Sequence, residues 1–275
     1  MNMSYGSRVC LMARGDEYHD INPVWDYARV PGTTAREESD ARLSAHTGWS
    51  ERSLPNDRTG SAVGTGCGVL HEVAEHDGIT AYTAFFVFDG CLAALGAGIR
   101  DVREGEKLPL AVTVDQAWTR DATPDGDYAP AGRLSPAGIV LRDGEGAVPS
   151  NGAFSYCNLD DTTRLVTRHG IRHGSWQRNS LERPDAPVQG DVFLVTVPVE
   201  RQDATYAYSV VPRGGDARVR VLSNTPACQA VACRREDGSE TVMAVFREAG
   251  TLTVRTPEGE SLTLCGERGT CRIHT

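Results

Sequence analysis

Two apolar runs joined by a single turn restrict the fold of this 275-residue chain more than any other feature. Residues 80–88 read Thr-Ala-Tyr-Thr-Ala-Phe-Phe-Val-Phe and end at Asp89-Gly90, after which residues 91–99 form a second apolar run. β-Branched and aromatic residues favour pleated strands, and Asp-Gly is typical of a tight hairpin turn. Residues 80–99 are therefore predicted to form a buried β-hairpin.

Strand-like runs recur along the chain, separated by turn residues. They lie at residues 110–114, 192–199, 205–211, 218–221, 241–246, 251–255 and 261–264. One short helix is expected over residues 34–45, where apolar positions stand among charges. This pattern predicts an all-β fold, a large antiparallel β-sandwich (supersandwich) followed by a small β-unit. A change of composition near Asn224–Cys233 divides the chain into a sandwich domain over 1–225 and a small C-terminal β-unit over 226–275.

Charge and hydropathy exclude several classes of partner. The net charge of −9 and the pI near 5.3 argue against general nucleic-acid binding, and a polyanionic partner would need a local basic region. No apolar stretch approaches the roughly 18 residues that span a bilayer, so no membrane partner is expected. The first residues also lack the apolar segment of a secretory signal. Eight cysteines are too few for a disulfide scaffold. Cys67 and Cys91 are expected as buried thiols, and Cys228, Cys233, Cys265 and Cys271 as free thiols or in one or two disulfides.

Several short passages occur in the order in which they occur in a known group of enzymes. They are Trp25–Thr34, Phe85–Gly90, Leu95–Ile99, Val112–Gln116, Gly174–Trp176, Ala204–Tyr208 and Leu222–Thr225. Through them, the chain resembles polysaccharide lyases of the heparinase II/III-like and hyaluronate/chondroitin lyase type over roughly residues 14 to 250. The resemblance is to the C-terminal β-sandwich region of these enzymes, and no passage resembles their N-terminal α/α-toroid.

The resemblance implies an enzymatic activity to which this chain contributes together with an N-terminal toroid. Such enzymes cleave uronate-containing polysaccharides by β-elimination, and their principal Tyr and His, with an Asn or Arg partner, come from the toroid. The expected partners are therefore an acidic polysaccharide, glycosaminoglycan-like in kind, and a toroid on a longer chain or on a split partner. Catalytic residues are not assigned within this chain. A secreted or periplasmic location is what the resemblance suggests, and a non-catalytic carbohydrate-binding or structural sandwich is the alternative function.

Basic and aromatic side chains supply the candidate substrate-binding residues. Between residues 164 and 183 the chain carries five arginines with two histidines and one tryptophan, and guanidinium groups pair bidentately with carboxylate or sulfate. The alternative is a solvated hairpin with ordinary surface arginines and Trp176 in the core. Trp25, Tyr27 and Arg29 alternate along one expected strand before the Pro31-Gly32 turn, so Arg29 could reach a substrate carboxylate, and a structural role is the competing interpretation. The candidates are Trp25, Arg29, Tyr156, Arg164, Arg168, Arg172 and Trp176.

His71 and Asp89 are the candidate metal ligands. In heparinase II-like lyases a His and an Asp at matching places help to bind a structural zinc, together with a later His. That later position falls near Ser150 or Asn151 here, where no His stands. Two ligands make a poor zinc site, and the alternative is a hydrogen-bonded strand histidine beside a turn-forming aspartate.

Overall fold

The computed structural model describes residues 8–37, 59–76, 78–88, 90–104, 108–119, 139–141, 151–178, 182–256 and 259–275. The chain forms two compact units, each built from segments that are distant in sequence. Unit 1 comprises residues 1–53, 103–155 and 164–200, and unit 2 comprises residues 54–102, 156–163 and 201–275.

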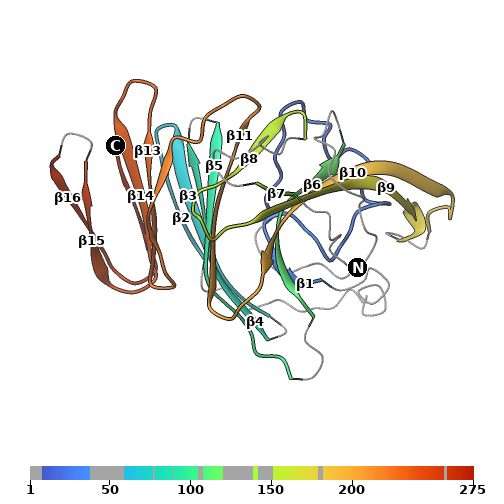
Figure 1. Cartoon of the computed structure of the whole chain (residues 1–275), viewed down its shortest axis with the longest axis horizontal. Helices are drawn as coiled ribbons and strands as arrows, with labels where there is room; N and C mark the ends of the chain where they lie inside the picture. Colours follow the sequence, from blue (N-terminus) through green and yellow to red (C-terminus); the bar gives the residue numbers. More distant parts are fainter. Residues whose placement is uncertain are drawn as a thin grey trace. The chain divides into compact units, whose positions relative to one another are not determined.

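Unit 1 is built on one five-stranded antiparallel sheet. Its order is β1 (Thr34–Arg36), β6 (Leu110–Trp118), β10 (Pro187–Val199), β9 (Leu165–Ser175) and β7 (Ile139–Leu141). The two longest strands, β9 and β10, run side by side (Figure 1), and a short 3-10 helix, η1 (Trp176–Arg178), follows β9 directly. The residues before β1 form turns over this sheet and bury Ile21 and Val24 against Val192 and Leu194 of β10.

The predicted hairpin lies at the centre of the larger sheet of unit 2. The strands β4 (Ile79–Phe88) and β5 (Cys91–Asp101) pair antiparallel, and Phe88 stands opposite Cys91. Gly90 has φ +78°, a conformation that glycine adopts without strain. The sheet has the order β2 (Gly60–Gly64), β3 (Cys67–His76), β4, β5, β11 (Ala204–Pro212) and β8 (Phe154–Asn158).

A four-stranded sheet packs on the six-stranded one and carries a further ribbon. Its order is β12 (Val219–Asn224), β13 (Cys228–Arg234), β14 (Glu240–Phe246) and β17 (Thr270–His274). One core joins the two sheets, with Phe86 and Leu95 on one side and Val231 and Met243 on the other. The opposite face of the four-stranded sheet buries its small residues against a two-stranded ribbon, β15 (Gly250–Arg255) and β16 (Ser261–Gly266) (Figure 1).

These elements confirm the all-β antiparallel prediction and correct one detail. The expected helix is wrong at its start, because Thr34–Arg36 pairs with β6 as strand β1, and residues 38–45 lie outside the described residues. All eight cysteines are free thiols, and Cys67 and Cys91 are buried as expected. Residues 226–275 belong to the same compact unit as the six-stranded sheet. The expected domain boundary at residue 225 stays a prediction. None of the described segments is a helix long and apolar enough to cross a membrane.

Candidate functional site

A row of three aromatic side chains lies on the turns that precede β1 in unit 1. The ring of Trp25 stacks on Tyr18, with centroids 5.9 Å apart, and on Tyr27, with centroids 6.5 Å apart. All three side chains are half-buried. Tyr18 and Trp25 also pack against the apolar cluster over β10. This packing holds the aromatic row against the sheet. A half-exposed aromatic row offers apolar ring surface to a ligand without a large rearrangement.

A buried ionic network holds the segment that carries the aromatic row. Asp26 is fully buried, and its Oδ2 accepts from Nη1 of Arg29 at 2.7 Å and pairs with Nη1 of Arg172 at 2.9 Å. Nη2 of Arg29 reaches Oε1 of Glu37 at 3.4 Å. Burial raises the pKa of Glu37, although the guanidinium groups of Arg29 and Arg168 act in the opposite direction. Because buried charges are stable only when they are paired, this network fixes the segment 26–37 on β9.

Strand alternation explains why these arginines turn inward. Side chains two and four residues apart point to one face of a strand, so Arg168 and Arg172 share the face of β9 that meets Asp26. Both are buried, 2% and 6% exposed. His173, on the other face of the strand, is exposed. The basic region that the sequence shows as continuous is therefore divided between two faces of one strand.

Gly174 lets the N-terminal segment approach the sheet closely, and Gly190 makes room for a side chain within the sheet. A Cβ on Gly174 would lie 1.7 Å from the carbonyl oxygen of Pro23, and one on Gly190 would lie 2.0 Å from Cζ3 of Trp118. Arg178 of η1 donates to the same Pro23 carbonyl at 2.9 Å. The passage Gly174-Ser175-Trp176 thus serves contact with the N-terminal turns, and any side chain at its glycine would collide with backbone.

A hydrogen-bonded chain runs from the aromatic row into the sheet. The hydroxyl of Tyr18 donates to Oδ1 of Asp115 at 2.9 Å, and Nδ2 of Asn151 donates to Oδ2 of the same carboxylate at 3.3 Å. Burial, and next the negative charge of Asp115, raise the pKa of Tyr18 well above its ordinary value. The Tyr18 phenol therefore stays protonated at neutral pH, which disfavours a role as a proton acceptor.

The backbone of the same segment is fixed by side-chain amide and carboxylate groups. Gln116 accepts from the amide of Asp26 at 2.7 Å and donates to the Asp26 carbonyl at 3.1 Å. Glu17 accepts from the amides of residues 13, 14 and 15 at 2.7 to 2.9 Å. Burial alone would raise the pKa of Glu17, but these backbone amides together lower it below its ordinary value. The turns thus keep their shape through polar contacts at both ends of the aromatic row.

The candidate residues fall into two groups. Trp25 belongs to the aromatic row, Trp176 is half-buried in η1, and Arg164 is exposed beside Glu200, with 3.4 Å between Nη1 and Oε1. Arg29, Arg168 and Arg172 are buried in the ionic network, and Tyr156, in unit 2, is 1% exposed. Their burial favours the structural alternative for these four residues, and a role in substrate binding stays a prediction for all seven.

The surroundings of His71, one of the two candidate metal ligands, are unfavourable for binding a metal ion. Burial, and next the nearby charge of Arg247, lower the pKa of His71 to about 4, and its Nε2 would lie 2.6 Å from a Cβ on Gly60. A cation close enough to lower this pKa would also repel a metal ion. Asp89 lies outside the described residues, and among the residues described no group of three His, Cys, Asp or Glu side chains is placed to hold a metal. The described surroundings of His71 thus do not fit a zinc ion.

Sequence reasoning missed the residues that organise this site. Tyr18 and Tyr27 were not assigned with Trp25, and Asp26 and Gln116 were not assigned at all. The signal for the aromatic row was the spacing of three aromatics over ten residues, 18 to 27. No local pattern indicates that Asp26 meets an arginine 146 positions later, because that contact depends on the fold of the whole unit.

Comparison with known proteins agrees with this architecture. The family model described as polysaccharide lyase family 8, super-sandwich domain, matches residues 1–221. Chondroitinase-AC from Pedobacter heparinus is 27% identical over 256 residues, which are 89% of this chain and 35% of that enzyme. The chain therefore spans about a third of the length of this curated relative.

Solved structures share the fold at lower identity. A chondroitinase AC lyase structure superposes with a TM-score of 0.70 at 22% identity, covering 95% of this chain and 43% of that one. A chondroitin AC lyase variant from Streptomyces coelicolor gives a TM-score of 0.65 at 20% identity, covering 95% and 34%. Xanthan lyase from Paenibacillus gives 0.63 at 17% identity, covering 88% and 26%. The heparinase II/III-like part of the expected resemblance receives no specific support. The family match extends over most of the sequence, so this chain belongs to polysaccharide lyase family 8, as a member of its super-sandwich domain family.

Proposed function

We propose that this chain is the β-sandwich part of a lyase that cleaves uronate-containing, glycosaminoglycan-like polysaccharides by β-elimination. Membership of polysaccharide lyase family 8 is the observation that carries the proposal, and the relation to chondroitinase-AC supports the substrate class. The family resemblance also supports a secreted or periplasmic location, where such polysaccharides are met.

β-Elimination requires proton transfers for which neither the Tyr18 phenol nor the His71 imidazole is suited. The proton at C5 of the uronate becomes acidic only when the neighbouring carboxylate is neutralised, and a base must then remove it while an acid protonates the departing oxygen. Tyr18 has a raised pKa and donates to Asp115, while His71 is buried beside the cation of Arg247. Because the principal Tyr and His of the lyases that this chain resembles come from the toroid, we assign the proton transfers to a toroid that works with this chain.

The contribution of this chain is a preorganised surface for the sugar chain. Carbohydrate rings present apolar C–H faces that pack on aromatic rings, and the aromatic row (Tyr18, Trp25 and Tyr27) supplies such rings on a segment fixed by buried ion pairs. A rigid binding surface loses little conformational entropy when the ligand binds. Tyr27, whose hydroxyl donates to the carbonyl of Asn22 at 3.3 Å, is the most direct probe of this surface.

Turnover assays test the proposal directly. The chain is mixed with chondroitin sulfate or hyaluronan, alone and with the separately produced toroid of a family 8 lyase, and the ultraviolet absorbance of the unsaturated product is followed. We expect turnover only with the toroid, and a loss of about tenfold or more for Tyr27→Ala. Ile171→Ala, which removes an exposed apolar side chain of the same unit, is the matched control. Absence of turnover with every toroid tried would refute the proposal, whether or not the chain binds the polysaccharide.

The aromatic row also favours a second candidate, a carbohydrate-binding sandwich without catalytic function. This candidate predicts saturable polysaccharide binding that weakens in Tyr27→Ala, with no product absorbance in the presence of any toroid. The two functions thus differ in one measurable quantity, the appearance of the unsaturated product.

A further inference from the structure

A second polar site lies in unit 2, where four arginines line a groove on the outer face of the four-stranded sheet. The groove has a volume of about 530 Å³ and is lined by Ala217, Arg218, Val219, Arg220, Ala232, Arg234, Glu240, Arg255 and Thr256. Ligand pockets in proteins typically have about 300–1,000 Å³. We call this feature the arginine groove.

Strand register explains why these residues lie on one face of the sheet. Arg220 of β12 stands opposite Ala232 of β13, and Arg234 at the end of β13 stands opposite Glu240 of β14. The amide of Arg234 donates to the carbonyl of Arg218 at 3.0 Å, so these two residues are neighbours across the strands. With a side-chain period of two, all of them share the face of the sheet on which Ala232 lies.

The ribbon β15–β16 covers only part of that face. It buries Ala232 and Val242 against Val254, and β15 ends at Arg255. Beyond this apolar cluster the same face of the sheet carries arginines instead of apolar residues. Ala232 lies between them, and its small side chain leaves space that forms the bottom of the groove. The groove is therefore the place where the covered face of the sheet meets solvent.

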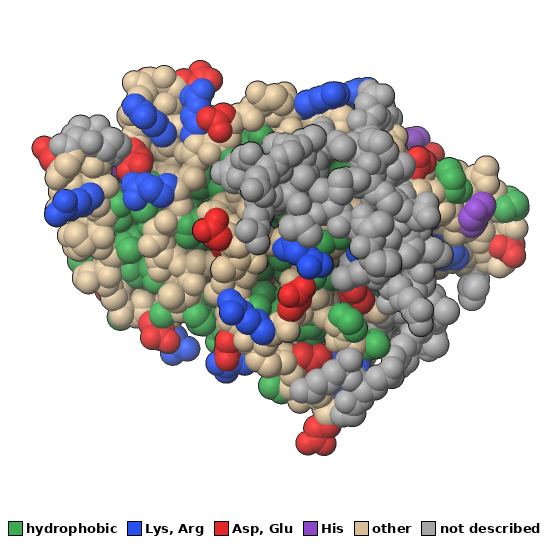
Figure 2. Space-filling view, viewed as in Figure 1, with side chains coloured by type: hydrophobic (Ala, Val, Ile, Leu, Met, Phe, Trp, Pro, Cys, Tyr) green, Lys and Arg blue, Asp and Glu red, His purple; other side chains and the backbone are tan. Residues whose placement is uncertain are grey.

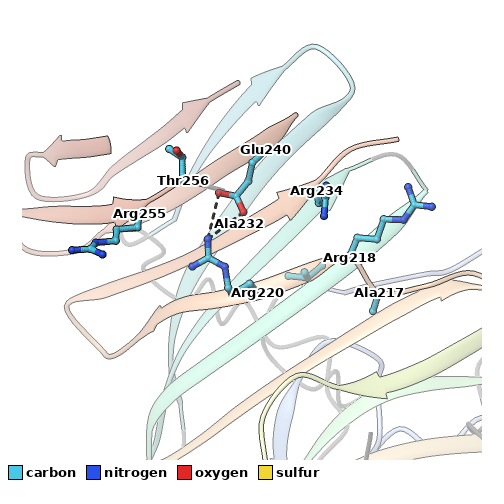
Figure 3. A pocket seen from close by; sticks show the side chains of 9 residues that line it. Ala217, Arg218, Arg220, Ala232, Arg234, Glu240, Arg255 and Thr256 are labelled. Atoms are coloured by element: carbon cyan, nitrogen blue, oxygen red, sulfur yellow. Dashed lines mark hydrogen bonds and ion pairs between the residues drawn. The ribbon is translucent and has the colours of Figure 1, made fainter. Parts of the chain in front are cut away.

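The arginine groove carries an excess of positive charge on an acidic protein. Four guanidinium groups face one carboxylate, whereas the whole chain has a net charge of −9. Glu240 forms an ion pair with Arg220, whose Nη2 lies 3.1 and 3.4 Å from the two carboxylate oxygens of Glu240 (Figure 3). Several basic side chains are visible on the surface of the C-terminal strands (Figure 2). A concave surface with one sign of charge concentrates counter-ions of the other sign.

All four arginines are exposed, and three of them have side-chain donors that no described residue uses. Arg218, Arg234 and Arg255 are exposed, and their side chains make no hydrogen bond or ion pair with any residue that the structure describes. Arg235 next to them behaves differently, since it donates to Thr241 Oγ1 at 2.7 Å and to the Thr65 carbonyl at 3.1 Å. Guanidinium groups with exposed donors bind carboxylate and sulfate groups through paired hydrogen bonds.

We infer that the arginine groove binds the sulfate and carboxylate groups of an acidic polysaccharide, as an anchoring site distinct from the aromatic row of unit 1. The choice of a polysaccharide among polyanions rests on the function proposed above, while the binding of anionic groups rests on the groove itself. Such a site would hold a long substrate chain on the protein between successive cleavages.

Binding of size-defined chondroitin sulfate oligosaccharides to the full chain tests the inference, with calorimetry as the readout. The groove variant Arg218→Ala/Arg234→Ala should bind about tenfold more weakly or worse, since a hydrogen bond to a charged group contributes roughly one decade of affinity or more. Arg201→Ala/Arg213→Ala removes the same charge from exposed positions outside the groove and should bind as the parent does. Arg218→Lys/Arg234→Lys, which keeps the charge and loses the paired donors, should fall between the parent and the alanine variant.

Further experiments distinguish a failure of this inference from a failure of the proposed function. In a Tyr27→Ala background the groove variant should still lower affinity, because the two sites act independently. Chemically desulfated chondroitin should bind more weakly than the sulfated form. Equal affinities of the groove and control variants, or no binding to the parent chain, would overturn the inference. Equal loss of polyglutamate binding in the groove variant would overturn the assignment to a polysaccharide. Groove-dependent binding without turnover would leave the inference standing and remove the proposed lyase function.

Discussion

Replacing Asp26 by Asn should destabilise unit 1 strongly, because this carboxylate neutralises two buried guanidinium groups. Asp26 is 0% exposed, and its Oδ2 lies 2.7 Å from Arg29 and 2.9 Å from Arg172. Asn has nearly the same shape and keeps the oxygen that accepts from the amide of Ala28 at 3.1 Å. The substitution therefore removes charge with little change of packing.

The expected loss in the free energy of unfolding is about 3–5 kcal/mol, the range found when one partner of a buried ion pair is removed. A typical domain is stable by only about 5–15 kcal/mol, so the effect should be plain in a urea titration followed by tryptophan fluorescence. Asp20→Asn is the matched control, because Asp20 and its neighbour His19 are 64% and 77% exposed, and an exposed pair contributes about 0–1 kcal/mol.

A double-mutant cycle then assigns the loss to the ion pair. Arg172→Met removes one guanidinium and keeps an apolar chain of similar length in the buried site. If the pair is responsible, the combined variant should lose less than the sum of the single variants, with a coupling energy of roughly 1–3 kcal/mol. A loss below about 1 kcal/mol for Asp26→Asn, or strict additivity in the cycle, would refute the claim that this network fixes the segment.

Three further predictions concern single residues. Gly174→Ala should lower the free energy of unfolding by about 3 kcal/mol, since its Cβ would meet the Pro23 carbonyl, whereas Gly250→Ala, with open space around it, should be nearly neutral by the same denaturation assay. The pKa of His71 is about 4 in the folded chain against about 6.5 unfolded, so the unfolded state binds more protons between these values. Stability should therefore fall by about 2–3 kcal/mol as the pH drops from 6.5 to 4, and His71→Gln should flatten this dependence in acid titrations. Burial raises the pKa of Cys91 to about 12, so iodoacetamide at pH 8 should label the exposed Cys265 and leave Cys91 unmodified until the chain unfolds, as peptide mass spectrometry would reveal.

The fold was accessible from the sequence because its signals are local. The strands β4 and β5 are continuous apolar runs on either side of a turn with Gly90, and both the hairpin and its pairing follow from that pattern. The start of β1 was mispredicted for the converse reason. Its three residues have no strand pattern of their own and become a strand by pairing with β6. Tertiary pairing decides the structure of such short segments.

The candidate site was less accessible, because its contacts join distant segments. The arginines of β9 looked like one basic surface, and the sequence gives no sign that Arg172 meets Asp26. Alternation along the strand was the available clue, since positions 168 and 172 share a face that positions 171 and 173 do not. The sequence pattern does not indicate that the N-terminal segment with Asp26 covers this face of β9. The arginine groove was missed for a related reason, as Arg218, Arg234 and Arg255 come from three strands with unremarkable local sequences.

The two groups of arginines differ in a way that separates structure from binding. In unit 1 the buried guanidinium groups of Arg29 and Arg172 are paired inside the protein with Asp26 and Glu37 at distances of 2.7 to 3.4 Å. In unit 2 all four arginines of the groove are exposed, and only Arg220 is paired with an acid, Glu240, among the residues that the structure describes. A buried arginine without its acid costs stability, whereas an exposed one costs little and remains available to a ligand. Charge removal in unit 1 should therefore change mainly the free energy of unfolding, and charge removal in the arginine groove should change mainly the affinity for an acidic chain.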